Sequence, residues 1–252
     1  MIDLAAAQGY RAIVFDRPGY GHSERPKGEK ATPFVQARLI HGALKQLGAE
    51  KPVMVGHSWS GTMTLTYALT YPNEISGIVT LAAAMYKEGY PAENGDPISK
   101  LVATPVIGDL IVNTLLKSPI GMALAENMVK QTFAFEPIPA DYREAALALW
   151  LRPGPFKANR EDILAFSPAA EEISKRYKEI RTPVMIVAGT EHPFGTIEQA
   201  LRLKEDIPHA KLKFVPNVAH MIPQNHPELV IEALNELTAD NSDDKRNPCE
   251  IV

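Results

Sequence analysis

A serine stands at the centre of the most informative segment of this chain. The apolar run 53–55 leads into Gly56-His-Ser-Trp-Ser-Gly61, and a helix-like segment begins at Thr62. A serine in a tight turn between a strand and a helix is held at the helix N-terminus, where backbone N–H groups and the helix dipole stabilise a developing negative charge. The segment therefore predicts Ser58 as a nucleophile, in the pattern Gly-x-Ser-x-Gly with Ser60 replacing the second glycine. The alternative is a structural turn serine.

His220 is the best candidate for the base that Ser58 requires, because a serine hydroxyl is a weak nucleophile until its proton is taken. It lies in a loop after the predicted strand 210–216, and Pro227 follows seven residues later. The alternative is a surface loop histidine. The remaining histidines show no metal-ligand spacing, and no phosphate-binding glycine loop is visible. The sequence therefore predicts no metal and no cofactor.

Alternating strand and helix signals predict an α/β fold in which helices cover both faces of a mostly parallel sheet. A helix is expected from Pro33 to Leu47, with Thr32 as its N-cap and Gly48 closing it. The polar segment 239–252 is predicted to be a disordered tail. Strands are expected at 10–16, 53–56, 75–83, 182–189 and 210–216.

The periodicity changes between residues 84 and 180, where helical pieces are punctuated by Pro and Gly and strand signals are absent. Leu, Ile, Val, Phe and Met recur in this stretch. We expect it to form a helical insertion over an apolar pocket, with most of its apolar side chains packing against the rest of the protein.

The chain resembles the α/β-hydrolase superfamily, in the serine-nucleophile subgroup that carries a helical lid. The resemblance implies a core formed by 1–83 and 181–238 and a lid formed by 84–180. It also implies the chain order nucleophile, acid, histidine. It rests on Asp16-Arg-Pro-Gly-Tyr-Gly-His-Ser23, Gly56–Gly61, Pro183–Gly189 and His220 followed by His226-Pro-Glu228.

The resemblance also implies an oxyanion hole, in which the backbone N–H of Trp59 is one donor. In the family, three strands and a His-Gly loop that supplies the second donor precede a helix matching residues 1–9. Nothing in this sequence corresponds to them, so we interpret the chain as an N-terminally truncated gene model, a fragment or a degenerate paralogue. One missing strand would lie between 13–16 and 53–56. We therefore expect unpaired backbone groups there, or direct closure of the two strands.

The family's catalytic triad consists of the nucleophile, the acid and the histidine. The acid is the second point at which this chain departs from the family pattern. An aspartate is expected in the pattern Gly-x-x-Asp after the strand that ends near Gly189, and His192 occupies that position. A neutral imidazole is a poor substitute for the carboxylate that stabilises the charged base. Glu191 is the nearest replacement. A carboxylate after the strand 75–83 is the other possibility, although the available residues, Glu88, Glu93 and Asp96, lie far along the chain.

Composition narrows the function further. With 252 residues, 45% of them hydrophobic, and a net charge of −4, the chain can bury a sizeable core and has no strong electrostatic case for nucleic acid or an anionic membrane. A single cysteine, Cys249, suits a reducing compartment and favours a cytoplasmic location. No signal peptide or membrane-length apolar run is visible. The oligomeric state is left open.

The leading prediction is a serine hydrolase that cleaves small-molecule carboxylic esters of apolar acyl groups. Amide and carbon–carbon bond hydrolysis use the same triad and are not separated from ester hydrolysis. Serine at the nucleophile position argues against the dehalogenase and epoxide-hydrolase branches. Two alternatives remain: an impaired hydrolase homologue that at most binds a ligand, and an interaction module acting through the charged tail.

Overall fold

The computed structural model describes residues 1–116, 118–191, 194–239 and 250–252. All pairings between the strands of its single sheet are parallel, in the order β1-β6-β2-β3-β4-β5. This confirms the predicted α/β class with a parallel sheet. The strands are β1 (Arg11–Ala12), β2 (Val53–His57), β3 (Gly77–Leu81), β4 (Val184–Gly189), β5 (Lys211–Val215) and β6 (Glu250–Ile251).

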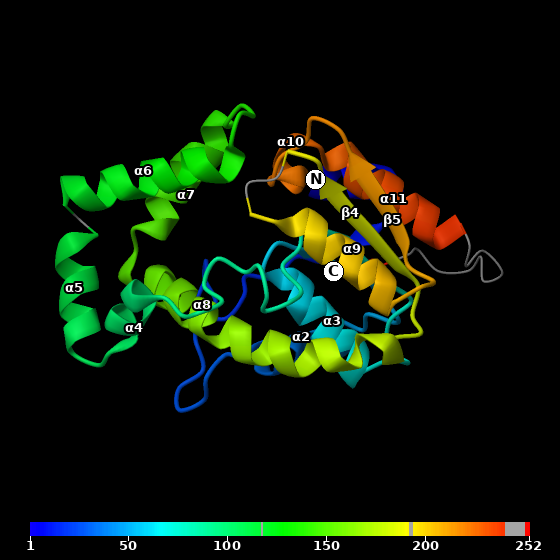
Figure 1. Cartoon of the computed structure of the whole chain (residues 1–252), viewed down its shortest axis with the longest axis horizontal. Helices are drawn as coiled ribbons and strands as arrows, with labels where there is room; N and C mark the ends of the chain where they lie inside the picture. Colours follow the sequence, from blue (N-terminus) through cyan, green and yellow to red (C-terminus); the bar gives the residue numbers. More distant parts are fainter. Residues whose placement is uncertain (117, 192–193, 240–249) are drawn as a thin grey trace.

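Helices cover both faces of the sheet (Figure 1). The period-two alternation of strands places Met54 and Ile78 against α2, α3, α9 and the helix α8 (Pro153–Ile173), and Val53 and Val79 against α1 and α11. The flanking helices are α1 (Ile2–Ala7), α2 (Pro33–Gln46), α3 (Ser60–Thr70), α9 (Thr196–Asp206), α10 (Ile222–Asn225) and α11 (Pro227–Ala239).

Local signals set several of these boundaries. The Thr32 side chain accepts a hydrogen bond from the Val35 N–H at 3.3 Å, and Pro33 occupies the first turn of α2, as the sequence predicts. Residue 227, also a proline, begins α11. The start of α2 was therefore predictable from its capping residue and its first-turn proline.

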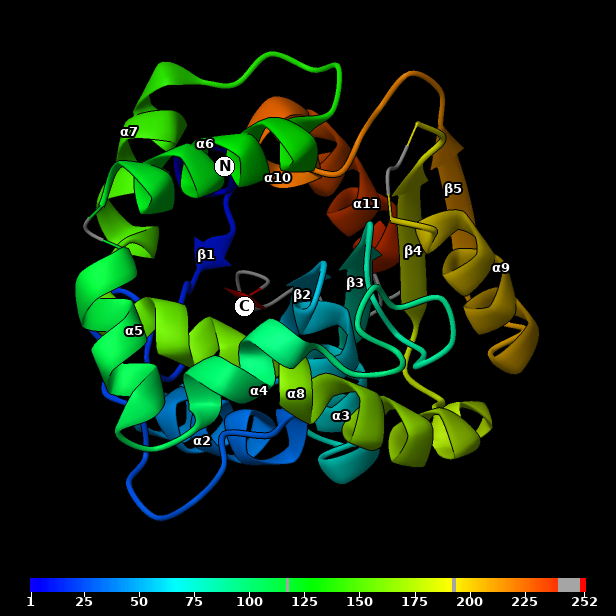
Figure 2. The same ribbon diagram turned by 60° about the vertical axis from the view of Figure 1, so that its left-hand side comes forward.

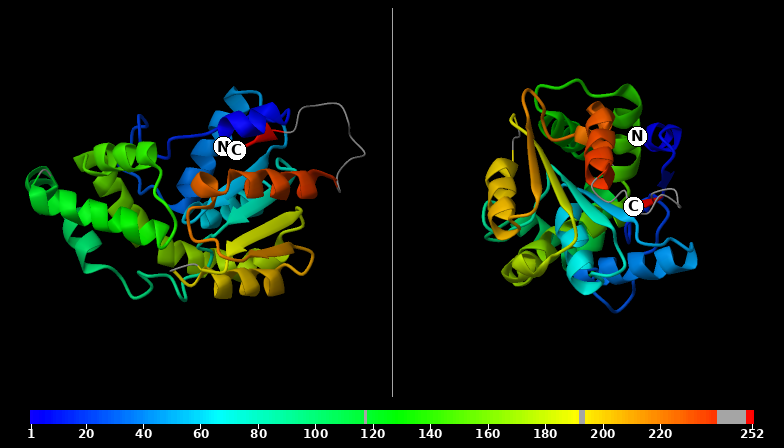
Figure 3. Two further views of the ribbon diagram at one scale, coloured as in Figure 1. Left: turned by 90° about the horizontal axis from the view of Figure 1, so that it is seen from above. Right: turned by 90° about the vertical axis from the view of Figure 1, so that its right-hand side faces the viewer.

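The segment between β3 and β4 is helical throughout its regular structure. Helices α4, α5, α6 and α7 stand to one side of the sheet (Figures 1 and 3), and α8 runs back along α3. The helices are α4 (Pro97–Ala103), α5 (Ile107–Leu115), α6 (Pro119–Phe133), α7 (Ala140–Trp150), α8 (Pro153–Ile173) and the 3-10 helix η1 (Ser174–Glu179). Within the described residues no single helix is long and apolar enough to span a membrane; α4 and α5 meet that test only as a pair, which is bent by 106°.

A strand from the end of the chain fills the gap that the sequence predicts between β1 and β2. In β6, Ile251 pairs with Ala12 on one side and with Val53 on the other (Figure 2). The Ile13 N–H donates to the Ile251 carbonyl at 2.8 Å, and the Val252 N–H donates to the Val53 carbonyl at 2.9 Å. The two neighbouring strands therefore neither close on each other nor stay wholly unpaired.

This arrangement corrects two expectations. The expected disordered tail is wrong for Glu250–Val252, because burial of Ile251 and the backbone pairing stabilise a strand there; residues 240–249 lie outside the described part, and Ala239 ends α11. The expected strand 10–16 is reduced to β1, because β6 ends at Ile251 and offers no ladder partner beyond that point.

A buried carboxylate fastens α8 to the turn after β1. Asp162 is 1% exposed and lies 2.7 Å from Arg17 Nη1 and 2.9 Å from Arg25 Nη2. The Tyr20 hydroxyl and the Gln36 amide donate to the same carboxylate at 3.1 and 3.2 Å. Because it pairs with both guanidiniums, this carboxylate connects α8 to the turn after β1 by charge-assisted hydrogen bonds.

The substitution Asp162→Asn is expected to lower the free energy of unfolding by about 3 kcal/mol, because it leaves the largely buried Arg17 guanidinium without its charge partner and Arg25 with only Glu161. Urea unfolding followed by circular dichroism measures this loss. Glu161→Gln is the matched control: this neighbouring carboxylate also pairs with Arg25, at 2.7 Å, but is more exposed, so its loss should cost less than about 1 kcal/mol. Equal effects of the two substitutions would contradict the assignment.

Candidate active site

Ser58 occupies the sharp turn between β2 and α3 with a φ of +55°, a left-handed conformation that non-glycine residues rarely adopt. Three backbone hydrogen bonds hold it there. Its N–H donates to the Leu81 carbonyl at 3.1 Å, and its carbonyl accepts from the N–H groups of Gly61 and Ala84, both at 3.0 Å. The strained conformation is therefore imposed by β3 and by the first turn of α3.

The glycines of the motif are needed for close packing around this turn. A Cβ on Gly56 would lie 2.8 Å from the Ser60 carbonyl oxygen, and a Cβ on Gly61 would lie 2.4 Å from the Cβ of Ala83. Neighbouring atoms therefore approach the Cα atoms of residues 56 and 61 too closely to leave room for a side chain. Ser60, which replaces the second glycine of the pattern, is the first residue of α3.

Ser58, Trp59 and His220 line one cavity of about 620 Å³. Its wall also includes Phe194, which follows β4, and Met128 from α6. The helices inserted between β3 and β4 therefore contribute to the wall of the cavity. His220 is 6% exposed, and the Phe194 ring lies edge-on to it, with centroids 5.2 Å apart. The structure therefore brings together the predicted nucleophile, base and oxyanion donor around a space large enough for a small-molecule ligand.

His57 is hydrogen-bonded to the backbone of His220, the predicted base. Its Nε2 lies 2.8 Å from the His220 carbonyl oxygen, and the two imidazole rings are 4.7 Å apart. Burial lowers the pKa of His57 from 6.5 to about 4, so the ring is neutral near pH 7. Because a carbonyl only accepts, the Nε2 must carry the proton and donate it, which ties the end of β2 to the loop of the predicted base.

Trp59 is held by contacts with α8 and with the turn after β1. Its indole N–H donates to the Asp162 carbonyl at 3.1 Å, and the Arg17 guanidinium lies 4.3 Å above its ring centroid. Arg17 is itself paired with the Asp162 carboxylate. The side chain is therefore fixed from two sides, which restrains the backbone N–H that we expect to face an oxyanion.

Glu191 lies on the loop after β4, with its N–H donating to the Val218 carbonyl at 3.2 Å. Its side chain is exposed, and its carboxylate accepts from the Thr190 hydroxyl at 3.4 Å. The structure thus places the backbone of Glu191 beside the loop that leads to His220, and its role as the acid stays a prediction. His192, at the expected acid position, lies outside the described residues.

The carboxylates after β3 have other partners. Glu88 forms an ion pair with Arg202 at 2.7 Å. Glu93 accepts from the Gly89 N–H, and Asp96 caps α4 through the Ile98 N–H at 2.9 Å. Within the described part of the chain, no group of three or more His, Cys, Asp or Glu side chains could hold a metal ion.

Glu136 is a residue at this site that the sequence analysis missed. Its carboxylate is nearly buried, accepts from the Ala219 N–H at 3.2 Å and pairs with the His226 ring. It follows α6 and reaches the residue just before His220, so it connects the inserted helices to the loop of the predicted base. No local sequence signal could have found it, because the contact joins positions 83 residues apart.

The family model described as alpha/beta hydrolase fold matches residues 1–227. The chain therefore belongs to the alpha/beta hydrolase family and is an enzyme of the hydrolase type, which confirms the resemblance that the sequence motifs indicate.

Two relatives are named as hydrolases. One is the 2-hydroxy-6-oxononadienedioate/2-hydroxy-6-oxononatrienedioate hydrolase of Paraburkholderia phymatum, 25% identical over 90% of this chain and 76% of its own. The other is the 2-hydroxy-6-oxo-6-phenylhexa-2,4-dienoate hydrolase of Burkholderia cepacia, 25% identical over 93% of this chain and 77% of its own. Among solved structures, an esterase from Exiguobacterium antarcticum is similar in fold, with a TM-score of 0.74 at 18% identity over 94% of this chain and 85% of its own.

The neutral state of the partly buried His57 predicts a pH dependence of stability. The unfolded chain binds a proton near pH 6.5 and the folded chain only near pH 4, so the free energy of unfolding falls as the pH drops through this window, by at most about 3 kcal/mol. Urea unfolding at pH 7.0, 5.5 and 4.5 measures the decline. His57→Gln should remove this part of the pH dependence, while His22→Gln, at an exposed ring, should retain it. An unchanged pH dependence in His57→Gln would contradict the assignment.

Proposed function

We propose that this chain is a serine hydrolase that cleaves carboxylic esters of apolar acyl groups through an acyl-enzyme intermediate. The observation that carries the proposal is the strained Ser58 turn opening into the same cavity as a largely buried His220. Strain of this kind is retained at functional sites because it presents a side chain in a conformation that relaxed turns do not provide.

The proposed chemistry proceeds in two steps. In the first, the Ser58 Oγ attacks the ester carbonyl while His220 takes its proton, and the Trp59 N–H stabilises the oxyanion. His220 then returns the proton to the departing alkoxide, which leaves as an alcohol. In the second step, His220 removes a proton from water and the hydroxide attacks the acyl group. His220 then returns this proton to the Ser58 Oγ as the bond between that oxygen and the acyl group breaks and the carboxylic acid departs.

The helices 84–180 are proposed to act as a lid over this cavity, and the wall composition supports an apolar acyl group. Met128 and Ile163 from those helices, together with Ala82, Ala84 and Phe194, offer hydrocarbon surface around the serine. Apolar walls with a few convergent polar groups are the usual composition of a small-molecule site.

Reaction of Ser58 with a fluorophosphonate tests the nucleophile. Intact-mass spectrometry of the 252-residue chain is expected to show one probe adduct, because an activated serine forms a stable phosphonyl ester. Ser58→Ala should abolish the adduct, while Ser60→Ala, two residues away, should retain it. Absence of any adduct on a folded chain would instead favour an impaired homologue that at most binds a ligand.

Glu191 is proposed as the acid that orients His220, supported by its place on a loop that is hydrogen-bonded to the segment before that histidine. Glu191→Gln is then expected to lower kcat for p-nitrophenyl butyrate by up to ~10⁴, because the imidazolium loses its charge partner. His192→Asp should change the rate little. A large rise in His192→Asp with no loss in Glu191→Gln would mean that position 192 is the vacant acid site.

Carbon–carbon bond hydrolysis of an acidic ketone is a second candidate. Arg17 and Arg160 line the cavity, and the Arg160 Nε is buried without a hydrogen-bond partner among the described residues, so an anionic substrate would have cations nearby. The names of the two hydrolase relatives point the same way. Turnover of 2-hydroxy-6-oxo-6-phenylhexa-2,4-dienoate in preference to p-nitrophenyl butyrate would favour this reaction over ester cleavage.

A further inference from the structure

Glu136 contacts both ends of the chain segment that carries His220. One oxygen of its carboxylate, Oε2, accepts from the Ala219 N–H at 3.2 Å, and the other, Oε1, pairs with Nε2 of the His226 ring. The Glu136 side chain is 5% exposed. Because His220 lies between the two contacts, this one carboxylate holds the segment of the proposed base. We call residues 219–226 the base segment.

Further contacts dock the base segment on the end of α6, which lies beside α10 in Figure 2. Met221, the residue after the proposed base, is buried and packs in one cluster with Val129 and Phe133 of α6. The Asn225 side-chain amide donates to the Pro137 carbonyl at 3.1 Å. Apolar packing and hydrogen bonds therefore act together at this contact between α6 and the base segment.

A neighbouring face of α6 lines the cavity that contains Ser58. Met128, Gln131 and Thr132 belong to its wall, and they have the i, i+3, i+4 spacing of one helix face. Val129 and Phe133, which pack against the base segment, are shifted by one residue, or about 100° around the helix axis. The helix therefore presents one face to the cavity and the adjoining face to the base segment.

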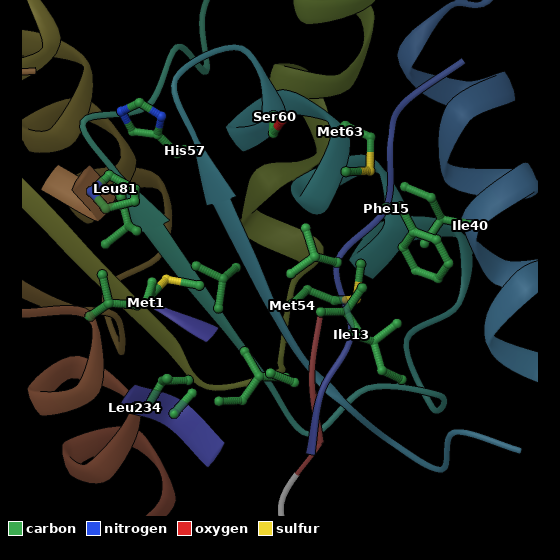
Figure 4. Close-up of a pocket in the computed structure, with 18 of the residues that line it drawn as sticks. Met1, Ile13, Phe15, Ile40, Met54, His57, Ser60, Met63, Leu81 and Leu234 are labelled. Atoms are coloured by element: carbon green, nitrogen blue, oxygen red, sulfur yellow. The ribbon is translucent and has the colours of Figure 1, made fainter. Parts of the chain in front are cut away.

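The nucleophile turn is held independently of α6. The backbone hydrogen bonds of Ser58 run to β3, to α3 and to Ala84. On the other side of the turn, His57 and Ser60 border a second pocket (Figure 4), and none of the described residues that line it belongs to α6. A change in the position of α6 would therefore act on the base segment and leave the nucleophile turn in place.

We propose that Glu136 is a positioning residue for His220, and that α6 makes this positioning depend on the acyl group in the cavity. An acyl chain that reaches Met128 stabilises α6 in its docked position, and Glu136 then holds the base segment where His220 takes the proton of Ser58. A short acyl group leaves this face of α6 without a contact. Binding energy from the unreactive part of the substrate thus raises the rate of the chemical step. This inference rests on the proposed ester hydrolysis.

The experiment compares p-nitrophenyl acetate with p-nitrophenyl hexanoate on the full 252-residue chain. In the unmodified chain kcat should be about tenfold higher for the hexanoate, because only the longer acyl group contacts α6. In Glu136→Ala the kcat values should become equal through loss of the hexanoate rate, while KM for the hexanoate changes by less than about threefold. Activity is lowered rather than abolished, since His57 still holds the His220 carbonyl.

Glu126→Gln is the matched control. Glu126 also lies on α6, but it pairs with Arg143 of α7, so its loss removes an ion pair between the two helices and none to the base segment. This variant should keep the ratio of the two kcat values. Hydrogen exchange of the Ala219 amide should be faster in Glu136→Ala and unchanged in Glu126→Gln, which locates the effect at the base segment.

A conservative variant separates positioning from a loss of folding. Glu136→Gln has nearly the same shape and retains an oxygen that accepts from the Ala219 N–H, but it loses the charge that pairs with His226. Its ratio of the two kcat values should fall between those of the unmodified chain and Glu136→Ala.

The outcomes distinguish this inference from the proposed function. If the unmodified chain shows no dependence of kcat on acyl length, or if Glu136→Ala and Glu136→Gln slow both esters equally or change only KM, the positioning role is overturned while ester hydrolysis stands. If the unmodified chain shows no turnover that Ser58→Ala abolishes, the proposed function is overturned, and the positioning role with it.

Discussion

The backbone hydrogen bonds that hold Ser58 in a left-handed conformation are the constraint on which the rest of the site depends. They join the end of β2 to the end of β3 and to the first turn of α3, so the turn exists only where those elements pack closely. Gly56 and Gly61 make this possible, since a side chain at either position would collide with its neighbours. The serine is therefore presented by the sheet itself rather than by a mobile loop.

Two buried carboxylates connect the Ser58 turn and the His220 loop to the helices between β3 and β4. Asp162 on α8 fixes Arg17 and, through its backbone carbonyl, the indole of Trp59, while Glu136 joins the inserted helices to the residue before His220. Asp162 lies on the side of Ser58 and Trp59, and Glu136 lies on the side of His220. The helices between β3 and β4 are thus fastened both to the Ser58 turn and to the loop of His220, the proposed base, and both residues line the same cavity.

Local signals in the sequence predicted the strands β2 to β5, the cap of α2, and the placement of Ser58 and His220 in loops at the ends of strands. These features depend on periodicity, turn residues and capping, which act over a few positions. The pairing of β6 between β1 and β2, and the contacts of Glu136 and Asp162, were not predictable, because each joins segments far apart in the chain. The expected strand 10–16 failed for the same reason, as its length depends on a distant partner.

The central claim is that Ser58 is activated by His220 within this enclosure. The rate of Ser58 acylation by a fluorophosphonate, followed between pH 5 and 8 in the unmodified chain and in His220→Ala, tests it most directly. We expect the rate to rise with pH through a single ionisation in the unmodified chain, as a histidine base loses its proton. In His220→Ala the rate should be orders of magnitude lower and should lack that ionisation. An identical pH profile and rate in both proteins would contradict the account.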